Sequence, residues 1–136
     1  MMAEKRFILL IEDNPDDRAL TVRALRNIDY EIVSAVDGAA GLGLLEGKHA
    51  KDLPAVVLLD IKLPKIGGLE VLRRMRADAR TASIPVVMLT SSKEEPDLSA
   101  SFKAGANSYI SKPVDLDRFI KAVRMLNLPG IPVHAK

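Results

Sequence analysis

The stretch "AVVLLD", residues 55–60, decides the fold, because five apolar residues lead without interruption to one carboxylate. Such a run, with almost no alternation of apolar and polar residues, is typical of a strand buried on both faces of a parallel sheet. Four more short apolar runs occur, "FILLI" (7–11), "EIVSAV" (31–36), "IPVVMLT" (84–90) and "SYIS" (108–111), and of these "IPVVMLT" also shows little alternation. The sequence therefore predicts five strands.

Helical spacing appears in the segments between and after these runs. The expected helices cover residues 15–28, 38–48, 67–77, 95–104 and 115–126. Asn14 suits the N-cap of the first helix, and Pro15 suits its first position. Leu20, Ala24 and Ile28 would then form its apolar stripe. Strands that alternate with helices predict an α/β fold, a doubly wound three-layer (βα)5 sandwich with right-handed crossovers.

Length and composition predict a single domain of residues 1–136, with a core over about 5–126 and a C-terminal tail over 127–136. The absence of cysteine excludes a disulfide framework and a thiolate metal site. A net charge of +2 is too balanced to argue for a nucleic-acid partner. No apolar run approaches the roughly 20 residues that a membrane span needs. We expect a cytoplasmic domain that binds neither DNA nor membrane.

Polar residues follow the strands at the point where each strand ends. Glu12 and Asp13 follow the first strand, Asp60 ends the third, Thr90 ends the fourth and Lys112 follows the fifth. In open α/β sheets, ligands bind beyond the carboxyl ends of the strands. If the first and third strands are neighbours, the three carboxylates converge and need a cation. Oxygen ligands without cysteine or a nearby histidine favour Mg²⁺.

The acidic stretch "IEDNPDD", residues 11–17, divides into two groups on this reading. Glu12 and Asp13 would face the cleft, where Mg²⁺ offsets their repulsion. Asp16 and Asp17 would lie in the first turn of the next helix, where each carboxylate complements the helix dipole by about 0.3–1 kcal/mol. The sequence thus predicts that the first two acids contribute to a metal site and that the last two stabilise the start of a helix.

The chain resembles the response-regulator receiver domains of two-component signalling over nearly all of residues 5–126. The matching pieces are "LLIEDN", "VVLLDIKLP", "GGLEVLRRMR", "IPVVMLTSS", "KAGANSYISKP" and "LDRFIKAV". Their order and spacing are specific, although no single piece is. The resemblance implies the doubly wound fold with the strand order 2-1-3-4-5.

The resemblance also implies roles for the residues around the third strand. Asp60 matches the phosphoacceptor, and Asp13 matches the acid that binds Mg²⁺ directly. Glu12 matches the acid that holds the ion largely through water, and the backbone carbonyl of Lys62 matches a further ligand. The Lys62 side chain and Ser92 occupy positions that modulate dephosphorylation in the family.

Four more residues match positions on the other side of the cleft. Thr90 matches the switch hydroxyl, which moves to bond the phosphoryl oxygen, and Tyr109 matches the aromatic that turns inward when it does. Lys112 matches the lysine that pairs with the phosphoryl group. Pro113 matches a proline usually preceded by a cis peptide bond. A lone tyrosine on a last strand is also a common packing residue, so both readings of Tyr109 stay open.

The function that the resemblance implies is that of a single-domain response regulator. A histidine kinase would donate a phosphoryl group to Asp60 with Mg²⁺ bound, and the receiver would itself catalyse this transfer and the later dephosphorylation. The face made by the fourth helix, the fifth strand and the fifth helix would then switch. The motifs "EDNPDD", "TSS" and "NSYISKP" are most similar to stand-alone receivers that partner phytochrome-type histidine kinases. A downstream protein or phosphotransfer partner would receive the message, and the tail would fold back or help to form a homodimer.

Two alternatives of other classes stay open. One is a receiver-like scaffold that binds partners independently of phosphorylation, against which the complete acid set argues. The other is an enzyme of the same topology. A phosphatase with an aspartyl nucleophile would want a second aspartate at position 62, where this chain has lysine. A flavin carrier would want a hydroxyl-rich loop after the first strand, where this chain has "EDNPDD".

Overall fold

The computed structural model describes residues 7–46, 52–91, 95–124 and 126. Ten elements alternate along this part of the chain. They are β1 (Phe7–Ile11), α1 (Pro15–Ala24), β2 (Glu31–Ala35), α2 (Gly38–Leu45), β3 (Val56–Asp60), α3 (Gly68–Ala77), β4 (Val86–Thr90), α4 (Glu95–Lys103), β5 (Ser108–Ser111) and α5 (Leu116–Arg124). The five predicted strands and five predicted helices are all present, each within a few residues of its expected ends.

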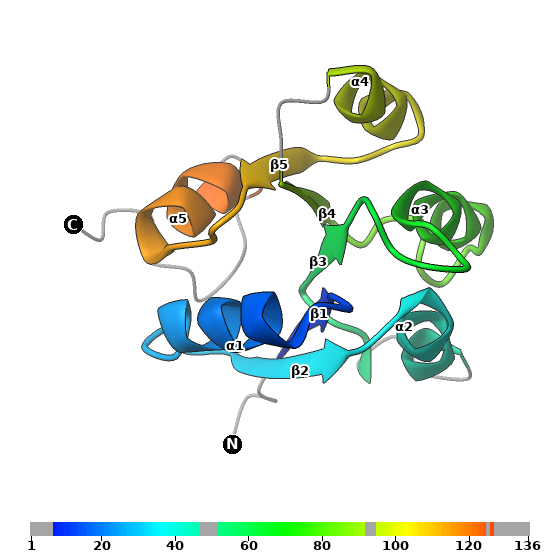
Figure 1. Ribbon diagram of the computed structural model, residues 1–136. Coiled ribbons are helices and arrows are strands. Elements are labelled where there is room, and N and C mark those ends of the chain that lie inside the picture. The colour runs from blue at the N-terminus through cyan, green and yellow to red at the C-terminus, as the bar shows by residue number, and fades with distance from the viewer. Residues whose placement is uncertain (1–6, 47–51, 92–94, 125, 127–136) are drawn as a thin grey trace.

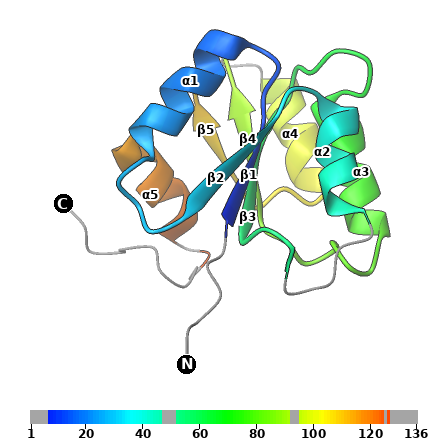
Figure 2. The same ribbon diagram turned by 90° about the horizontal axis from the view of Figure 1, so that it is seen from below.

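The strands form one parallel sheet in the order β2-β1-β3-β4-β5, as predicted. Helices α1 and α5 cover one face, and α2, α3 and α4 cover the other (Figures 1 and 2). All five strands therefore point their carboxyl ends toward the same edge of the sheet. None of the helices in the described ranges is long and apolar enough to cross a lipid bilayer.

Alternate side chains of the strands pack on opposite faces of the sheet. On β1, Ile8 and Leu10 belong to the core beneath α1 and α5, and Leu9 and Ile11 to the core beneath α2 and α3. All four are fully buried. The central strands β3 and β4 are buried along their whole length, which explains why their sequences lack alternation.

Helix α1 corrects one prediction about its packing. Asn14 caps the helix through the Asp17 N–H, at 3.0 Å, and Pro15 begins it, as expected. The expected apolar stripe is wrong at Leu20, which is 47% exposed. Ala24 is half-buried and Ile28 is buried, but the fully inward positions of the helix face are Thr21 and Leu25. Thr21 tolerates burial because its hydroxyl donates to the Asp17 carbonyl at 2.9 Å. The inward face of α1 thus lies one residue further along the chain than its hydrophobic pattern indicated.

A clamp of hydrogen bonds fixes the loop between α4 and β5. Gly105 follows α4 with φ of +111°, the left-handed conformation that favours glycine at a helix end. Its carbonyl accepts from Arg76 Nε at 3.1 Å and Arg76 Nη2 at 2.9 Å. Arg76 Nη2 also donates to Asn107 Oδ1 at 3.0 Å, and the same oxygen accepts from the Val86 N–H at 2.9 Å. The end of α3, the loop after α4 and the start of β4 are therefore joined.

Candidate functional site

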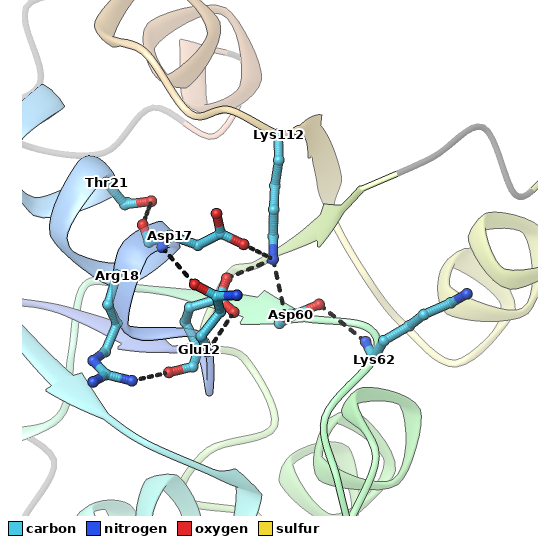
Figure 3. A network of polar contacts seen from close by, with 8 residues as sticks. Glu12, Asp17, Arg18, Thr21, Asp60, Lys62 and Lys112 are labelled. Carbon is cyan, nitrogen blue, oxygen red and sulfur yellow. Dashed lines mark hydrogen bonds and ion pairs between the residues drawn. The ribbon is translucent and has the colours of Figure 1, made fainter.

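The carboxyl edge of the sheet brings together the polar residues that the sequence singled out. Asp60 is the last residue of β3, Thr90 is the last of β4, and Glu12 directly follows β1. Lys112 directly follows β5, and its side chain extends across the edge toward Asp60 and Glu12 (Figure 3). The peptide bond between Lys112 and Pro113 is cis, as the resemblance implied.

The Lys112 ammonium is shared by three carboxylates. Its Nζ lies 2.7 Å from Glu12 Oε1, 3.1 Å from Asp60 Oδ2 and 3.1 Å from Asp17 Oδ2. Burial opposes its charge most strongly, but the bonds to its carboxylate partners outweigh burial and hold the pKa of Lys112 above its ordinary value. Lys112 therefore stays a cation at physiological pH.

Glu12 is a buried acid whose protonation is finely balanced. Its side chain is fully buried, and burial raises its pKa from 4.5 to about 7, with Asp60 adding to the rise and Lys112 opposing it. The Asn14 N–H donates to Glu12 Oε2 at 3.1 Å, and Arg18 Nη1 donates to the Glu12 carbonyl at 2.9 Å. These contacts hold the carboxyl group in place although its charge is poorly solvated.

Glu12, Asp13 and Asp60 form a cluster that fits a hard divalent cation. One carboxylate oxygen of each lies within 4.8 Å of the others. Glu12 and Asp60 are buried and Asp13 is exposed, so the cluster is open to solvent on one side. Glu12 Oε1 has the ion pair with Lys112 but no hydrogen bond of standard geometry. A buried, undersatisfied oxygen in an all-oxygen donor set is the environment that Mg²⁺ or Mn²⁺ prefers.

The loop after β3 holds the Asp60 carboxylate from its other side. The Lys62 N–H donates to Asp60 Oδ1 at 3.0 Å, whereas the Lys62 side chain extends away from Asp60 (Figure 3). At the start of α3, the Gly68 N–H donates to the Ile61 carbonyl at 3.0 Å. A Cβ at position 68 would overlap the Asp60 carbonyl oxygen and lie 2.8 Å from Ile61 Cα. Gly68 therefore permits α3 to begin directly against the backbone of Asp60.

Thr90 and Tyr109 lie on neighbouring strands but in different environments. Thr90 is 5% exposed, and its carbonyl accepts from the Lys112 N–H at 2.8 Å. Tyr109 is 46% exposed and stacks edge-on against Phe102 of α4, with ring centroids 6.3 Å apart. The tyrosine ring thus lies on the outer surface between α4 and β5 in this structure. Ser92, the other position expected to modulate dephosphorylation, lies outside the described residues.

Asp17 is a member of the site that the sequence analysis placed elsewhere. We expected it only to complement the dipole of α1, yet its carboxylate contacts Lys112 Nζ (Figure 3). Its neighbour Asp16 is exposed in the first turn of α1. The sequence could have indicated this position of Asp17, because the spacing of Asp17, Thr21 and Leu25 puts these residues on one helix face. Threonine, however, does not mark a buried face in a hydrophobic pattern.

The parallel sheet and this acidic edge define the class of protein. The chain belongs to the family of response regulator receiver domains, whose family model matches residues 8–124. Members of this family accept a phosphoryl group from histidine kinases and bind a divalent cation at an acidic site.

Individual relatives include both longer regulators and stand-alone receivers. The DNA-binding dual master transcriptional regulator RpaA of Synechocystis sp. is 38% identical over 131 residues, which are 95% of this chain and 53% of RpaA. The chain thus spans about half the length of that relative. The response regulator Rcp1 of Synechocystis sp. is 36% identical over 124 residues, covering 88% of this chain and 84% of Rcp1.

Solved structures of response regulators are also similar to this chain. The bacteriophytochrome response regulator AtBRR is 46% identical with a TM-score of 0.82, covering 93% of this chain and 95% of AtBRR. The Mn²⁺-bound form of Rcp1 is 33% identical with a TM-score of 0.74, covering 96% of this chain and 99% of that one.

Proposed function

We propose that the chain is a single-domain response regulator in which Asp60 accepts the phosphoryl group. The observation that carries this proposal is the setting of the Asp60 carboxylate. One of its oxygens accepts from the Lys62 N–H at 3.0 Å, and the other lies 3.1 Å from Lys112 Nζ, beside the Glu12 and Asp13 carboxylates. A nucleophile, a fixed cation and an acidic cation site are thereby combined at one strand end.

In the proposed reaction, an Asp60 carboxylate oxygen forms a bond to phosphorus as the bond from phosphorus to the histidine nitrogen of the kinase breaks. Lys112 stabilises the negative charge on the phosphoryl oxygens, and the Lys62 N–H orients the carboxylate. Positioning and charge stabilisation supply most of the catalysis in such transfers. Mg²⁺, bound by Glu12, Asp13, Asp60 and the Lys62 carbonyl, would supply further positive charge.

The proposed output is a change at the surface formed by α4, β5 and α5. Phosphorylation would draw the Thr90 hydroxyl toward the phosphoryl group, and Tyr109 would leave Phe102 and turn inward. The exposed position of Tyr109 is consistent with the unphosphorylated state of such a switch. A ligand or modification shifts a two-state equilibrium only through different contacts in the two states, and here the new contact is the phosphoryl oxygen with Thr90.

The proposed partners are a histidine kinase and a downstream protein or phosphotransfer partner in the cytoplasm. Similarity to AtBRR supports a kinase of the phytochrome type. We further propose that residues 1–136 form one receiver domain without DNA contacts. The tail over 127–136, for which the sequence leaves both fold-back and a homodimer contact open, lies outside the described residues. Sizing chromatography before and after phosphorylation tests the dimer.

Intact mass spectrometry tests the central proposal. The wild type, incubated with Mg²⁺ and a small acyl phosphate donor, should gain the mass of one phosphoryl group, and Asp60→Asn should not. If the wild type gains none under conditions that phosphorylate a known receiver, the scaffold alternative is favoured. Equal gain in Asp60→Asn would assign the phosphoryl group to another residue.

A further inference from the structure

We propose that Asp17 is a positioning residue that divides the positive charge of Lys112 between helix α1 and the phosphorylation site. This inference rests on the proposed function, because it concerns the lysine that would face the phosphoryl group. Asp17 would thereby tune the site in opposite directions toward cations and toward anions, strengthening Mg²⁺ binding and weakening phosphoryl binding.

The argument begins with the number of donors on Lys112. An ammonium group has three N–H donors and no acceptor. In this structure Lys112 Nζ has three carboxylate partners, at 2.7 Å (Glu12), 3.1 Å (Asp60) and 3.1 Å (Asp17). The contacts to Asp60 and Asp17 are hydrogen bonds, and the contact to Glu12 is an ion pair. A phosphoryl group attached to Asp60 must therefore share Lys112 with carboxylates that are already bound to it.

The partners differ in their relation to the phosphorylation site. Glu12 and Asp60 belong to the acidic cluster, so both would face a bound cation. Asp17 comes from α1 and lies outside that cluster. It is therefore the partner that can keep Lys112 oriented while the acids of the cluster bind a cation. Its side chain is 36% exposed, against 13% for Lys112, so solvent weakens but does not remove its effect.

The charge of Asp17 has two predictable consequences. It attracts a cation in the neighbouring acidic cluster, both directly and because it neutralises part of the repulsion from Lys112. It repels an anion on Asp60, both directly and because it neutralises part of the attraction of that anion by Lys112. Removal of the Asp17 charge should therefore weaken Mg²⁺ binding and strengthen the binding of a phosphoryl group or its mimic. Damage to the structure of the site would instead weaken both.

The adjacent residue provides a matched control. Asp16 lies in the same first turn of α1 and is exposed. Asp16→Asn and Asp17→Asn each remove one negative charge from the same helix end, so their effects on the helix dipole are similar. They differ in the contact with Lys112, which the structure gives to Asp17. Any difference between the two variants reports on that contact.

Isothermal titration calorimetry tests the proposal without requiring turnover, and it suits a chain that has no tryptophan. Mg²⁺ is titrated into the metal-free protein, and beryllium trifluoride, a phosphoryl mimic, is titrated at saturating Mg²⁺. Asp17→Asn should bind Mg²⁺ about three- to tenfold more weakly and beryllium trifluoride about three- to tenfold more tightly than wild type. Asp16→Asn should change each by less than about twofold.

The possible outcomes separate this inference from the proposed function. Loss of both affinities in Asp17→Asn, no change in either, or an equal effect in Asp16→Asn would overturn the role of Asp17 alone. If Asp17→Asn does not fold, Asp17→Ala removes the same charge and is judged by the same criteria. Failure of the wild type to take up a phosphoryl group from an acyl phosphate would overturn the proposed function, and this inference with it.

Discussion

Substitution of Gly68 tests whether the close approach of α3 to β3 sets the geometry of Asp60. In Gly68→Ala, the new Cβ overlaps the Asp60 carbonyl oxygen and lies 2.8 Å from Ile61 Cα and 3.0 Å from the Ile61 carbonyl oxygen. These are backbone atoms of a buried strand end, so no side chain can rotate to relieve the overlap. Either α3 must move away or the segment that carries Asp60 must shift.

Both movements have a cost that can be stated. Overpacking of a well-packed site costs about 1–3 kcal/mol, from which a gain of at most about 1 kcal/mol in helix propensity is subtracted. We expect Gly68→Ala to lower the free energy of unfolding by about 1–2 kcal/mol. A shift of about 1 Å at a reacting group can cost about 100-fold in rate. We therefore expect the rate constant for phosphorylation of Asp60 to fall by about 10- to 100-fold.

Gly67 is the matched control, because a Cβ there would have only the Leu63 carbonyl oxygen nearby, at 4.0 Å. Gly67 is the N-cap of α3, and serine is a better N-cap than glycine. Gly67→Ser should therefore keep the wild-type rate and gain a few tenths of a kcal/mol in stability. Urea denaturation and time-resolved intact mass measure the two quantities. If Gly68→Ala matches the wild type in both, the contact does not constrain Asp60 and the reasoning is refuted.

Three further predictions concern other parts of the fold and site. Gly41→Ala should destabilise the chain by about 1–2 kcal/mol, because its Cβ would lie 2.8 Å from the buried Ile11 Cγ1. A Cβ at Gly43 has nothing within 4 Å, so Gly43→Ala should stabilise the chain by about 1 kcal/mol. Urea denaturation measures both changes. Because the pKa of Glu12 is raised from 4.5 to about 7, protonated Glu12 stabilises the metal-free fold below pH 4.5, and this contribution disappears as the pH rises through about 7. Wild type should therefore lose up to about 3 kcal/mol of unfolding free energy relative to Glu12→Gln across that interval. A constant difference between the two proteins would contradict this prediction. Asp13→Asn should leave the metal-free stability within about 0.5 kcal/mol of wild type, because Asp13 is exposed. The variant should nevertheless lose most of the roughly 2.7 kcal/mol of stability that Mg²⁺ adds at 100 times its Kd. Retained stabilisation by Mg²⁺ would exclude Asp13 as a ligand.

The sequence predicted the features that depend on strand ends. Asp60 follows an unbroken apolar run, so its position at the end of a central buried strand could be read directly from "AVVLLD". Glu12 and Lys112 follow other strands of the same parallel sheet, and parallel strands present their carboxyl ends at one edge. Once the strand order was known from the family resemblance, the approach of these side chains followed from topology alone.

The sequence did not predict the features that depend on how a helix is rotated about its axis. The error in the apolar stripe of α1 and the misplacement of Asp17 have the same origin. Residues 17, 21 and 25 form the inward face, but Thr21 has a polar side chain and was not counted as part of it. A shift of one residue is a rotation of about 100°, which is enough to turn Asp17 toward Lys112 and leave Asp16 exposed. The hydrogen bond that makes burial of Thr21 acceptable is local, from its hydroxyl to the carbonyl of Asp17 four residues earlier, but a count of apolar residues does not include it.

The Arg76 clamp has a mechanical consequence for the far side of the molecule. It holds the loop after α4 to α3 at the amino ends of β4 and β5, away from the phosphorylation site. When one end of a rigid helix is held in place, the displacement of its residues grows with their distance from that end. Motion of α4 that begins near Thr90 should therefore be largest at the end where α4 starts and smallest beside Gly105. In the proposed switch, Arg76 would keep the Gly105 end of α4 in place while the other end moves.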